Sequence, residues 1–179
     1  NLLALKILSP EFPGSPAEMK TFTQTLKQLL LLRHPNLVTL VNAGKTGPYC
    51  WLALEHIEGS SLARALQEPD ARRRSHWKQG LRMAIHLARV LAFLREHRLV
   101  HGNITPANVL FEHDSVGRER QTKLTDLMIN RALENSAMLE SRLEAKLKDE
   151  LGYLPPEVVE GAAPDSLSDL YGLGAVLYA

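Results

Sequence analysis

The chain has 179 residues, enough for one domain or most of one, and its hydrophobic (45%) and charged (23%) contents are ordinary for a globular protein. Its net charge of +1 gives no electrostatic reason to expect nucleic acid or a membrane as a partner. The single cysteine, Cys50, excludes an internal disulfide bond and favours a reducing, cytoplasmic compartment. No apolar run approaches the roughly 18 residues of a membrane-spanning helix, and no signal peptide is recognisable.

Hydrophobic periodicity and turn residues predict a mixture of strands and helices. The apolar run at 2–8 predicts a buried strand, and the prolines after it mark a loop. The strongest helix signal lies at 75–97, and 127–150 is polar and helix-prone. The apolar face predicted for the helix at 75–97 consists of Leu81, Ile85, Leu87, Ala88, Leu91, Ala92 and Leu94. The other predicted elements are helices at 17–33 and 61–67, the second capped by Ser60 or Ser61, strands at 37–43, 49–55, 109–111 and 122–124, and a terminal helix from about Ser168.

The two ends of the sequence indicate a piece of a longer protein. The first residues already have the pattern of a strand, and residues 170–179 have that of a helix in mid-run. We therefore expect further sequence on both sides.

The segment from His101 to Leu110 is the most informative part of the chain. It follows the long predicted helix and precedes the sequence Lys123-Leu124-Thr125-Asp126 by one predicted hairpin. The catalytic loop of protein kinases has the pattern His-Arg-Asp, four further residues and Asn. This segment resembles that loop, with Asn103 in the place of the aspartate and Asn108 in the place of the asparagine.

Other segments resemble protein kinase motifs in the family's order, so the resemblance covers nearly the whole chain. Each motif is weak alone, but their joint order makes coincidence a poor explanation. The short loops are similar to those of the eukaryotic-like kinases of bacteria. The matching segments are Ala4-Leu5-Lys6 (third strand), His34-Pro35-Asn36 (after the αC helix), 55–62 (interlobe hinge), Asp126-Leu127-Met128 (Asp-Phe-Gly), Pro155-Pro156-Glu157 (Ala-Pro-Glu) and 169–174 (αF helix).

The resemblance implies a two-lobed α+β protein-kinase fold that binds ATP and Mg²⁺. Residues 1–57 would form a partial N-lobe, from the third strand to the hinge, and 58–179 a C-lobe as far as the αF helix. Residues such as Leu29, Leu40, His101 and Leu127 would stack as one column between the lobes, and Asp169 would anchor the catalytic loop. The implied ligand contacts are Lys6 for the phosphates, Asn108 and Asp126 for Mg²⁺, Ala4 and Leu110 on either side of the adenine ring, and the backbones of Glu55 and Ile57 at its edge.

The departures from the family pattern occur at positions that take part in phosphoryl transfer. In the family an aspartate accepts the proton of the substrate hydroxyl, and the Asn103 amide is not a base near neutral pH. The αC acid that pairs with the lysine falls at Thr25, and Glu18 lies two helical turns away, roughly 10 Å along the axis. The family's loop arginine and phosphate-contacting lysine are replaced by Gly102 and Thr105.

Three functions stay open from the sequence. The first is a pseudokinase, which would bind nucleotide and a protein partner and act as a regulatory module. The second is a weakly active Ser/Thr kinase that transfers the γ-phosphate to a protein hydroxyl, because loss of a general base typically costs only about 10²–10⁴-fold in rate. The third is a small-molecule phosphotransferase, a group that shares the fold and often carries His-Gly-Asp in this loop.

Overall fold

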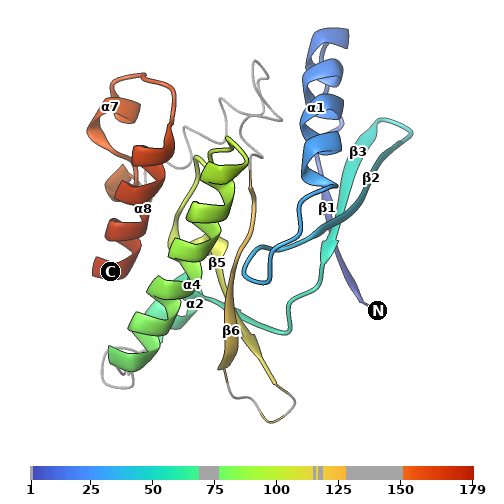
Figure 1. The fold of residues 1–179 in the computed structure, drawn as a ribbon. Helices are drawn as coiled ribbons and strands as arrows, with labels where there is room; N and C mark the ends of the chain where they lie inside the picture. The colour runs from blue at the N-terminus through green and yellow to red at the C-terminus, as the bar shows by residue number, and fades with distance from the viewer. Residues whose placement is uncertain (1, 69–76, 115, 117–118, 128–150) are drawn as a thin grey trace.

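The computed structural model describes residues 2–68, 77–114, 116, 119–127 and 151–179, and its elements form two groups (Figure 1). Helix α1 accompanies strands β1–β3 in one group, and helices α4, α7 and α8 lie with β5 and β6 in the other. The helix-prone stretch at 127–150 is outside the described residues from 128 onward. The strands are β1 (Leu3–Ile7), β2 (Leu40–Thr46), β3 (Tyr49–Glu55), β4 (Gly59–Ser61), β5 (Val109–His113) and β6 (Glu119–Leu124). The helices are α1 (Pro16–Leu29), α2 (Leu62–Gln67), α4 (Trp77–Glu96), α7 (Pro156–Val159) and α8 (Ser166–Tyr178), with 3₁₀ turns η1 (Pro106–Asn108) and η2 (Leu151–Tyr153).

The first sheet is antiparallel, with strand order β1-β3-β2. The prediction that the first strand is buried is wrong, because Leu3, Leu5 and Ile7 are 49–60% exposed. Strand β1 is an edge strand of this sheet, and its alternating side chains place these three on one face. Lys6 has the opposite orientation and lies across from Leu52 of β3.

Side-chain hydrogen bonds cap helix α1 at its N-terminus. The Ser15 hydroxyl accepts a hydrogen bond from the Glu18 N–H (3.2 Å), and the Glu18 carboxylate accepts one from the Gly14 N–H (3.0 Å). The regular helix ends at Leu29, four residues before the predicted end. The chain tightens there before Pro35, and the Arg33 guanidinium donates to the carbonyls of Leu30 and Leu32, just beyond the helix.

The second sheet, β4-β5-β6, is extended by the segment 36–38. The Val38 N–H donates to the Leu124 carbonyl, and the Leu124 N–H donates to the Asn36 carbonyl, both at 2.8 Å. The Asn36 side-chain amide also donates to the Thr122 carbonyl (2.9 Å). The strand predicted at 37–43 is therefore divided: its start lies beside β6, and regular pairing with β3 begins at Leu40.

Helix α4 buries only part of the predicted face: Leu87, Leu91 and Leu94 are buried as predicted. Leu81 and Ile85 are 52% and 43% exposed, and Ala88 and Ala92 are exposed too. The helix carries two apolar stripes of the same helical spacing, so periodicity alone could not choose between them. Packing against β6 and α8 selects the stripe formed by Met83, Leu87, Val90, Leu91 and Leu94.

The remaining helix starts follow side-chain capping. Ser61 caps α2 by accepting a hydrogen bond from the Arg64 N–H (3.2 Å), as predicted. Helix α8 starts two residues earlier than predicted, because Asp165 and Ser168 form a capping box. In the part of the chain that the structure describes, no helix is both long enough and apolar enough to cross a membrane.

An ion pair between Glu55 and Lys123 ties the first sheet to the second. The Lys123 Nζ lies 2.6 Å from Glu55 Oε1, and the lysine side chain is only 7% exposed. The other oxygen, Glu55 Oε2, accepts a hydrogen bond from the Thr39 N–H (3.2 Å). Burial alone would raise the pKa of the Glu55 carboxyl, but the bonds from Lys123 and Thr39 outweigh burial and hold this pKa below its usual value.

We predict unequal effects when either partner of this pair is removed. Glu55→Met leaves the buried Lys123 ammonium without a counter-charge and should lower the free energy of unfolding by about 1–3 kcal/mol. Lys123→Met leaves a carboxylate that is about one-third exposed to water, and should cost about 1 kcal/mol or less. Urea denaturation of both variants and of the double variant measures this. A double variant no more stable than Glu55→Met would contradict the prediction.

Candidate functional site

The predicted catalytic loop is held at its start by Asp169 of α8. The Asp169 carboxylate accepts hydrogen bonds from the His101 N–H (2.7 Å) and the Gly102 N–H (2.8 Å). Gly102 has φ +68°, in the left-handed region that glycine adopts without strain. One buried carboxylate therefore fixes the two backbone residues that precede Asn103.

Side chains within the loop complete its framework. His101 Nε2 lies 2.9 Å from the Thr125 carbonyl, and the Asn103 N–H lies 3.2 Å from His101 Nδ1. Because a carbonyl only accepts, these partners require a neutral imidazole with its proton on Nε2. The Asn108 amide nitrogen donates to the Asn103 carbonyl (2.8 Å). The loop is thus rigidly attached to the segment that leads to Asp126.

Asn103 is buried, with 3% of its surface exposed, and it lines a small cavity together with Tyr153, Pro155 and Asp169. An amide is uncharged, so the residue at this position cannot accept a proton near neutral pH. Thr105, at the position of the family's phosphate-contacting lysine, is also buried at 1% exposure. Neither the Asn103 nor the Thr105 side chain therefore carries a charge.

Lys6 and Asp126 are brought together from segments 120 residues apart. The Lys6 Nζ lies 2.5 Å from Asp126 Oδ2, and the two side chains are 29% and 13% exposed. Asp126 has φ +63°, a left-handed backbone conformation that aspartate tolerates better than most residues. The two charged groups predicted to hold phosphate and metal are thus neutralised by each other.

The αC position offers Lys6 no acidic partner. Thr25 lies on the buried side of α1, at 5% exposure. The Glu18 carboxylate is engaged with Gly14 and Ser15 at the N-terminus of the same helix. This leaves Asp126 as the carboxylate that the structure pairs with Lys6.

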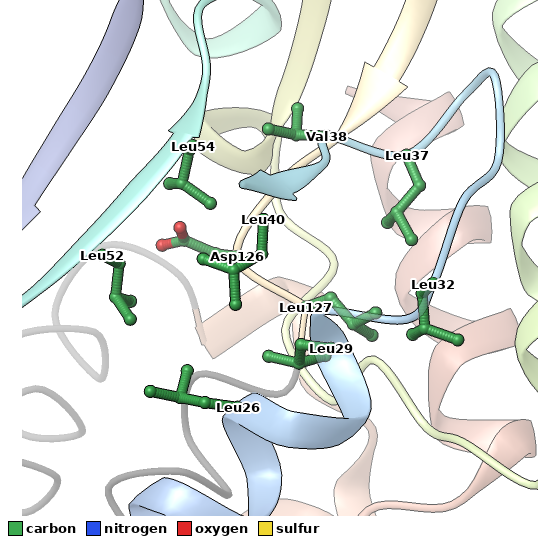
Figure 2. A pocket seen from close by; sticks show the side chains of 10 residues that line it. All are labelled: Leu26, Leu29, Leu32, Leu37, Val38, Leu40, Leu52, Leu54, Asp126 and Leu127. Atoms are coloured by element: carbon green, nitrogen blue, oxygen red, sulfur yellow. The ribbon is translucent and has the colours of Figure 1, made fainter. Parts of the chain in front are cut away.

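Leucine side chains surround Asp126 on the side facing α1 and β3 (Figure 2). Leu29, Leu40 and Leu127, three members of the predicted column, line one cavity beside it. This cavity measures about 40 Å³, whereas ligand pockets generally exceed about 300 Å³. It is therefore a gap in the apolar packing and not a nucleotide site. The fourth predicted member, His101, is fully buried and bonded to Thr125.

The predicted adenine contacts lie on β1, β5 and the segment after β3. Ala4 pairs with Leu54 and is exposed, and Leu110 pairs with Ser61 and Lys123 and is half-buried. Ile57, like Glu55, is partly exposed. These positions leave the surfaces assigned to adenine accessible.

Asn108 and Asp126 are suited to a divalent cation by their chemistry. Carboxylate and amide oxygens are hard ligands of the kind Mg²⁺ prefers, with phosphate oxygens supplying further ligands. The Asn108 amide nitrogen is committed to the Asn103 carbonyl, which leaves its side-chain oxygen as the available ligand atom. The Thr125 N–H donates to the Asn108 carbonyl (2.9 Å), so these two residues lie in neighbouring backbone segments. Among the residues described, no group of three or more His, Cys, Asp or Glu could hold a metal by itself.

Sequence reasoning missed Lys123 and the side chain of Glu55. Glu55 was assigned through its backbone, yet its carboxylate carries the contact between the sheets. The signal available in the sequence was a lysine inside the short predicted strand 122–124. In the structure both neighbours of this lysine are buried. Its partner is 68 residues away, which no local pattern reveals.

Burial raises the pKa of Asp169 to about 6, against the lowering effect of the His101 and Gly102 N–H groups. A raised carboxyl pKa means that the folded chain binds a proton more tightly than the unfolded chain. The stability from this group is therefore complete below pH about 3.8, the model-peptide value, and is lost as the pH rises through about 6.

We predict that Asp169→Asn removes a fall of about 2 kcal/mol in unfolding free energy between pH 4 and pH 7, taking about 1.4 kcal/mol per pKa unit and the part already lost below pH 4 into account. Urea denaturation across this pH range measures the slope. Asp165→Asn is the comparison: Asp165 is exposed, and the Ser168 and Leu167 N–H groups lower its own pKa. The Asp165 charge is the last and smallest of the causes that raise the Asp169 pKa, so this variant should keep most of the fall. Equal slopes for the parent chain and Asp169→Asn would contradict the assignment.

Comparisons with known proteins agree with this geometry. The family model described as protein tyrosine and serine/threonine kinase matches residues 2–179. The serine/threonine-protein kinase PrkC of Bacillus subtilis is 26% identical over 176 residues, which cover 98% of this chain and 26% of the relative. U-box domain-containing protein 33 of Arabidopsis thaliana is 30% identical over 179 residues (98% and 20%). A probable inactive receptor kinase of the same plant is 29% identical over 176 residues (92% and 16%).

The chain spans about a quarter or less of the length of these relatives. Its two antiparallel sheets with their helices make up part of the two-lobed α+β kinase fold. The chain belongs to the protein kinase family.

Proposed function

We propose that the chain is a pseudokinase domain: it binds ATP with Mg²⁺ and acts through a protein partner, without efficient phosphoryl transfer. The observation that carries this proposal is Asn103, an amide at the base position of a firmly anchored loop. Among the described residues that line its cavity, the acidic one is Asp169, and its carboxylate is engaged in holding the loop backbone.

Two further features support impaired transfer. Thr25 replaces the αC acid, so Lys6 has no partner on α1 to hold it in a fixed position for phosphate. Thr105 replaces the family's phosphate-contacting lysine and is buried. Phosphoryl transfer depends mostly on positioning and charge stabilisation, and these substitutions remove both kinds of support.

Nucleotide binding is supported by the groups that remain. Lys6 would hold the phosphates, Asn108 and Asp126 would hold Mg²⁺, and the metal would neutralise phosphate charge when bound. Ala4 and Leu110 would enclose the adenine ring, with the backbones of Glu55 and Ile57 at its edge. We place the boundary between N-lobe and C-lobe at 57/58 and the protein in the cytoplasm, where the buried Cys50 stays reduced.

A weakly active Ser/Thr kinase is the second candidate. It is favoured by relatives that are themselves named serine/threonine-protein kinases, including one from Bacillus subtilis. General-base catalysis is worth about 10²–10⁴-fold, so its loss alone leaves measurable turnover. The additional loss of the αC acid makes this candidate second. A small-molecule phosphotransferase ranks third, because residues 34–36, 155–157 and 169–174 follow the protein-kinase pattern.

We predict that ATP with Mg²⁺ raises the melting temperature of the chain, because binding to the folded state alone stabilises it. Lys6→Met should abolish the rise, and Asp126→Ala should abolish its magnesium-dependent part. Lys45→Met, on exposed β2 of the same sheet, is the control and should keep the full rise. No rise in the parent chain would remove nucleotide binding from the proposal, and an equal rise in Asp126→Ala would remove Asp126 as the ligand of Mg²⁺.

We predict that Asn103→Asp alone does not restore strong phosphotransfer. The variant regains a carboxylate at the base position, but Thr25 still offers Lys6 no acid. A radiolabel transfer assay with a general protein substrate measures the outcome, and the double variant Asn103→Asp/Thr25→Glu is the comparison. Robust transfer by the single variant would instead support the weakly active kinase.

A further inference from the structure

We propose that the groove beside the segment linking β3 to β4 is a docking site for an extended peptide of a partner protein, in which basic and apolar side chains alternate. This inference deepens the proposed function and rests on it, because it names the kind of partner through which a pseudokinase domain would act. The groove is separate from the groups assigned to phosphate and metal, since neither Lys6 nor Asp126 lines it.

Both sheets line this groove. It measures about 760 Å³, within the roughly 300–1,000 Å³ that is usual for ligand-binding sites. In Figure 1 the segment between β3 and β4 runs between the start of β1 and the β5–β6 hairpin. The first sheet contributes residues at the beginnings of β1 and β2, and the second contributes residues of β5 and β6 and of the segments next to β4 and β5. A partner in the groove would therefore contact both sheets.

The side formed by the first sheet is apolar and exposed. Leu2 and Leu3 are 79% and 49% exposed, and Val41 is 46% exposed. Single exposed apolar side chains are normal, but several that share one groove with polar residues are typical of an interaction surface. A partner that fits this side must bring apolar side chains to it, because only these gain from covering the leucines and the valine.

The side formed by the second sheet is acidic. Among the described residues that line it, carboxylates outnumber guanidinium groups; these charged residues are Glu58, Glu112, Asp114 and Arg120. The Glu112 carboxylate accepts a hydrogen bond from the Gln121 amide (2.6 Å), a neutral donor that holds the side chain without cancelling its charge. Glu55 also lines the groove, but Lys123 balances its charge. Charge complementarity therefore requires lysine or arginine on this side of the partner.

An extended peptide matches both sides at once. Successive side chains of an extended chain point in opposite directions, so a peptide that lies along the groove presents one set to the first sheet and the other set to the second. Basic residues at alternate positions, with apolar residues between them, satisfy both sides. A helix would instead gather residues three or four apart on one face. The order of the residues in the peptide, and not its composition alone, therefore decides binding.

Fluorescence anisotropy with two labelled peptides tests the proposal. The peptides Arg-Leu-Arg-Leu-Arg-Leu and Arg-Arg-Arg-Leu-Leu-Leu have the same composition and charge. The alternating peptide should bind the parent chain at least roughly 5-fold more tightly than the blocked one, because the blocked peptide cannot match both sides along its length. Binding should weaken as salt is added. Equal binding of the two peptides would show charge attraction alone and would overturn the proposal.

Carboxylate variants test the acidic side. Glu58→Gln/Glu112→Gln keeps side-chain size and should weaken binding of the alternating peptide at least roughly 5-fold. The matched control is Glu96→Gln/Glu160→Gln, which removes the same amount of charge from exposed positions outside the groove and should keep the affinity of the parent. An unchanged affinity in the first variant, or an equal loss in the control, would overturn the proposal.

The variant Leu3→Thr/Val41→Thr tests the apolar side. Threonine suits a strand, and both positions are exposed, so the fold should be kept. Affinity for the alternating peptide should fall at least roughly 5-fold, and its preference over the blocked peptide should disappear. Full retention of that preference would contradict the assignment of this side.

A second copy of the chain is the alternative occupant of the groove. Analytical ultracentrifugation of the parent chain and of Leu3→Thr/Val41→Thr decides between the two. A parent dimer that this variant dissociates would assign the groove to self-association and overturn the proposal. A monomer in both cases leaves the groove free for the peptide and supports it.

These outcomes are separable from those of the proposed function. If ATP with Mg²⁺ raises the melting temperature but the alternating peptide has no preference, the docking site is refuted and nucleotide binding stands. If the peptide binds through both sides but ATP produces no rise, nucleotide binding is refuted and the docking site stands. If neither ligand binds, both are refuted.

Discussion

Strand β6 is bonded along both edges, and the rest of the structure depends on this arrangement. One edge pairs with β5, and the other receives the segment 36–38, which comes directly from helix α1. Lys123 in the same strand holds Glu55 at the end of β3. The two sheets are therefore joined at β6, and the residues that follow this strand are Thr125 and Asp126. The contacts that join the sheets thus also set the position of Asp126 relative to Lys6.

The catalytic loop is attached to this joint through backbone atoms. Asp169 holds the N–H groups of His101 and Gly102, and Asn108 holds the carbonyl of Asn103. None of these contacts uses the Asn103 side chain. Replacement of aspartate by asparagine at this position is therefore compatible with the same loop geometry, and a retained kinase fold says little about activity. Activity depends instead on the side chains that face the reacting groups.

Local signals were sufficient for much of the fold and failed where distant residues decide. The cap at Ser61 and the strand at 49–55 could be predicted because their determinants are neighbours in sequence. The buried face of α4 could be predicted only in part: Leu87, Leu91 and Leu94 are buried as expected, but packing against β6 and α8 leaves the stripe through Leu81 and Ile85 exposed. The burial of β1 was overestimated because its position at the sheet edge is a property of pairing, not of its own residues. For the site, the family resemblance assigned Lys6 to phosphate and Asp126 to metal, but it did not predict that these two side chains would pair with each other.

Loss of one acid on α1 explains this neutralisation. In the family pattern the lysine is shared between the αC acid and phosphate, which leaves the metal-ligand aspartate for the metal. With Thr25 in the acid's place, the nearest opposite charge that the structure gives Lys6 is Asp126. Each member of the pair lowers the net charge that the other presents to an incoming ligand. With a neutral residue at position 25 of α1, the two charged groups assigned to nucleotide and metal are therefore engaged with each other in a contact between the first strand and the end of β6.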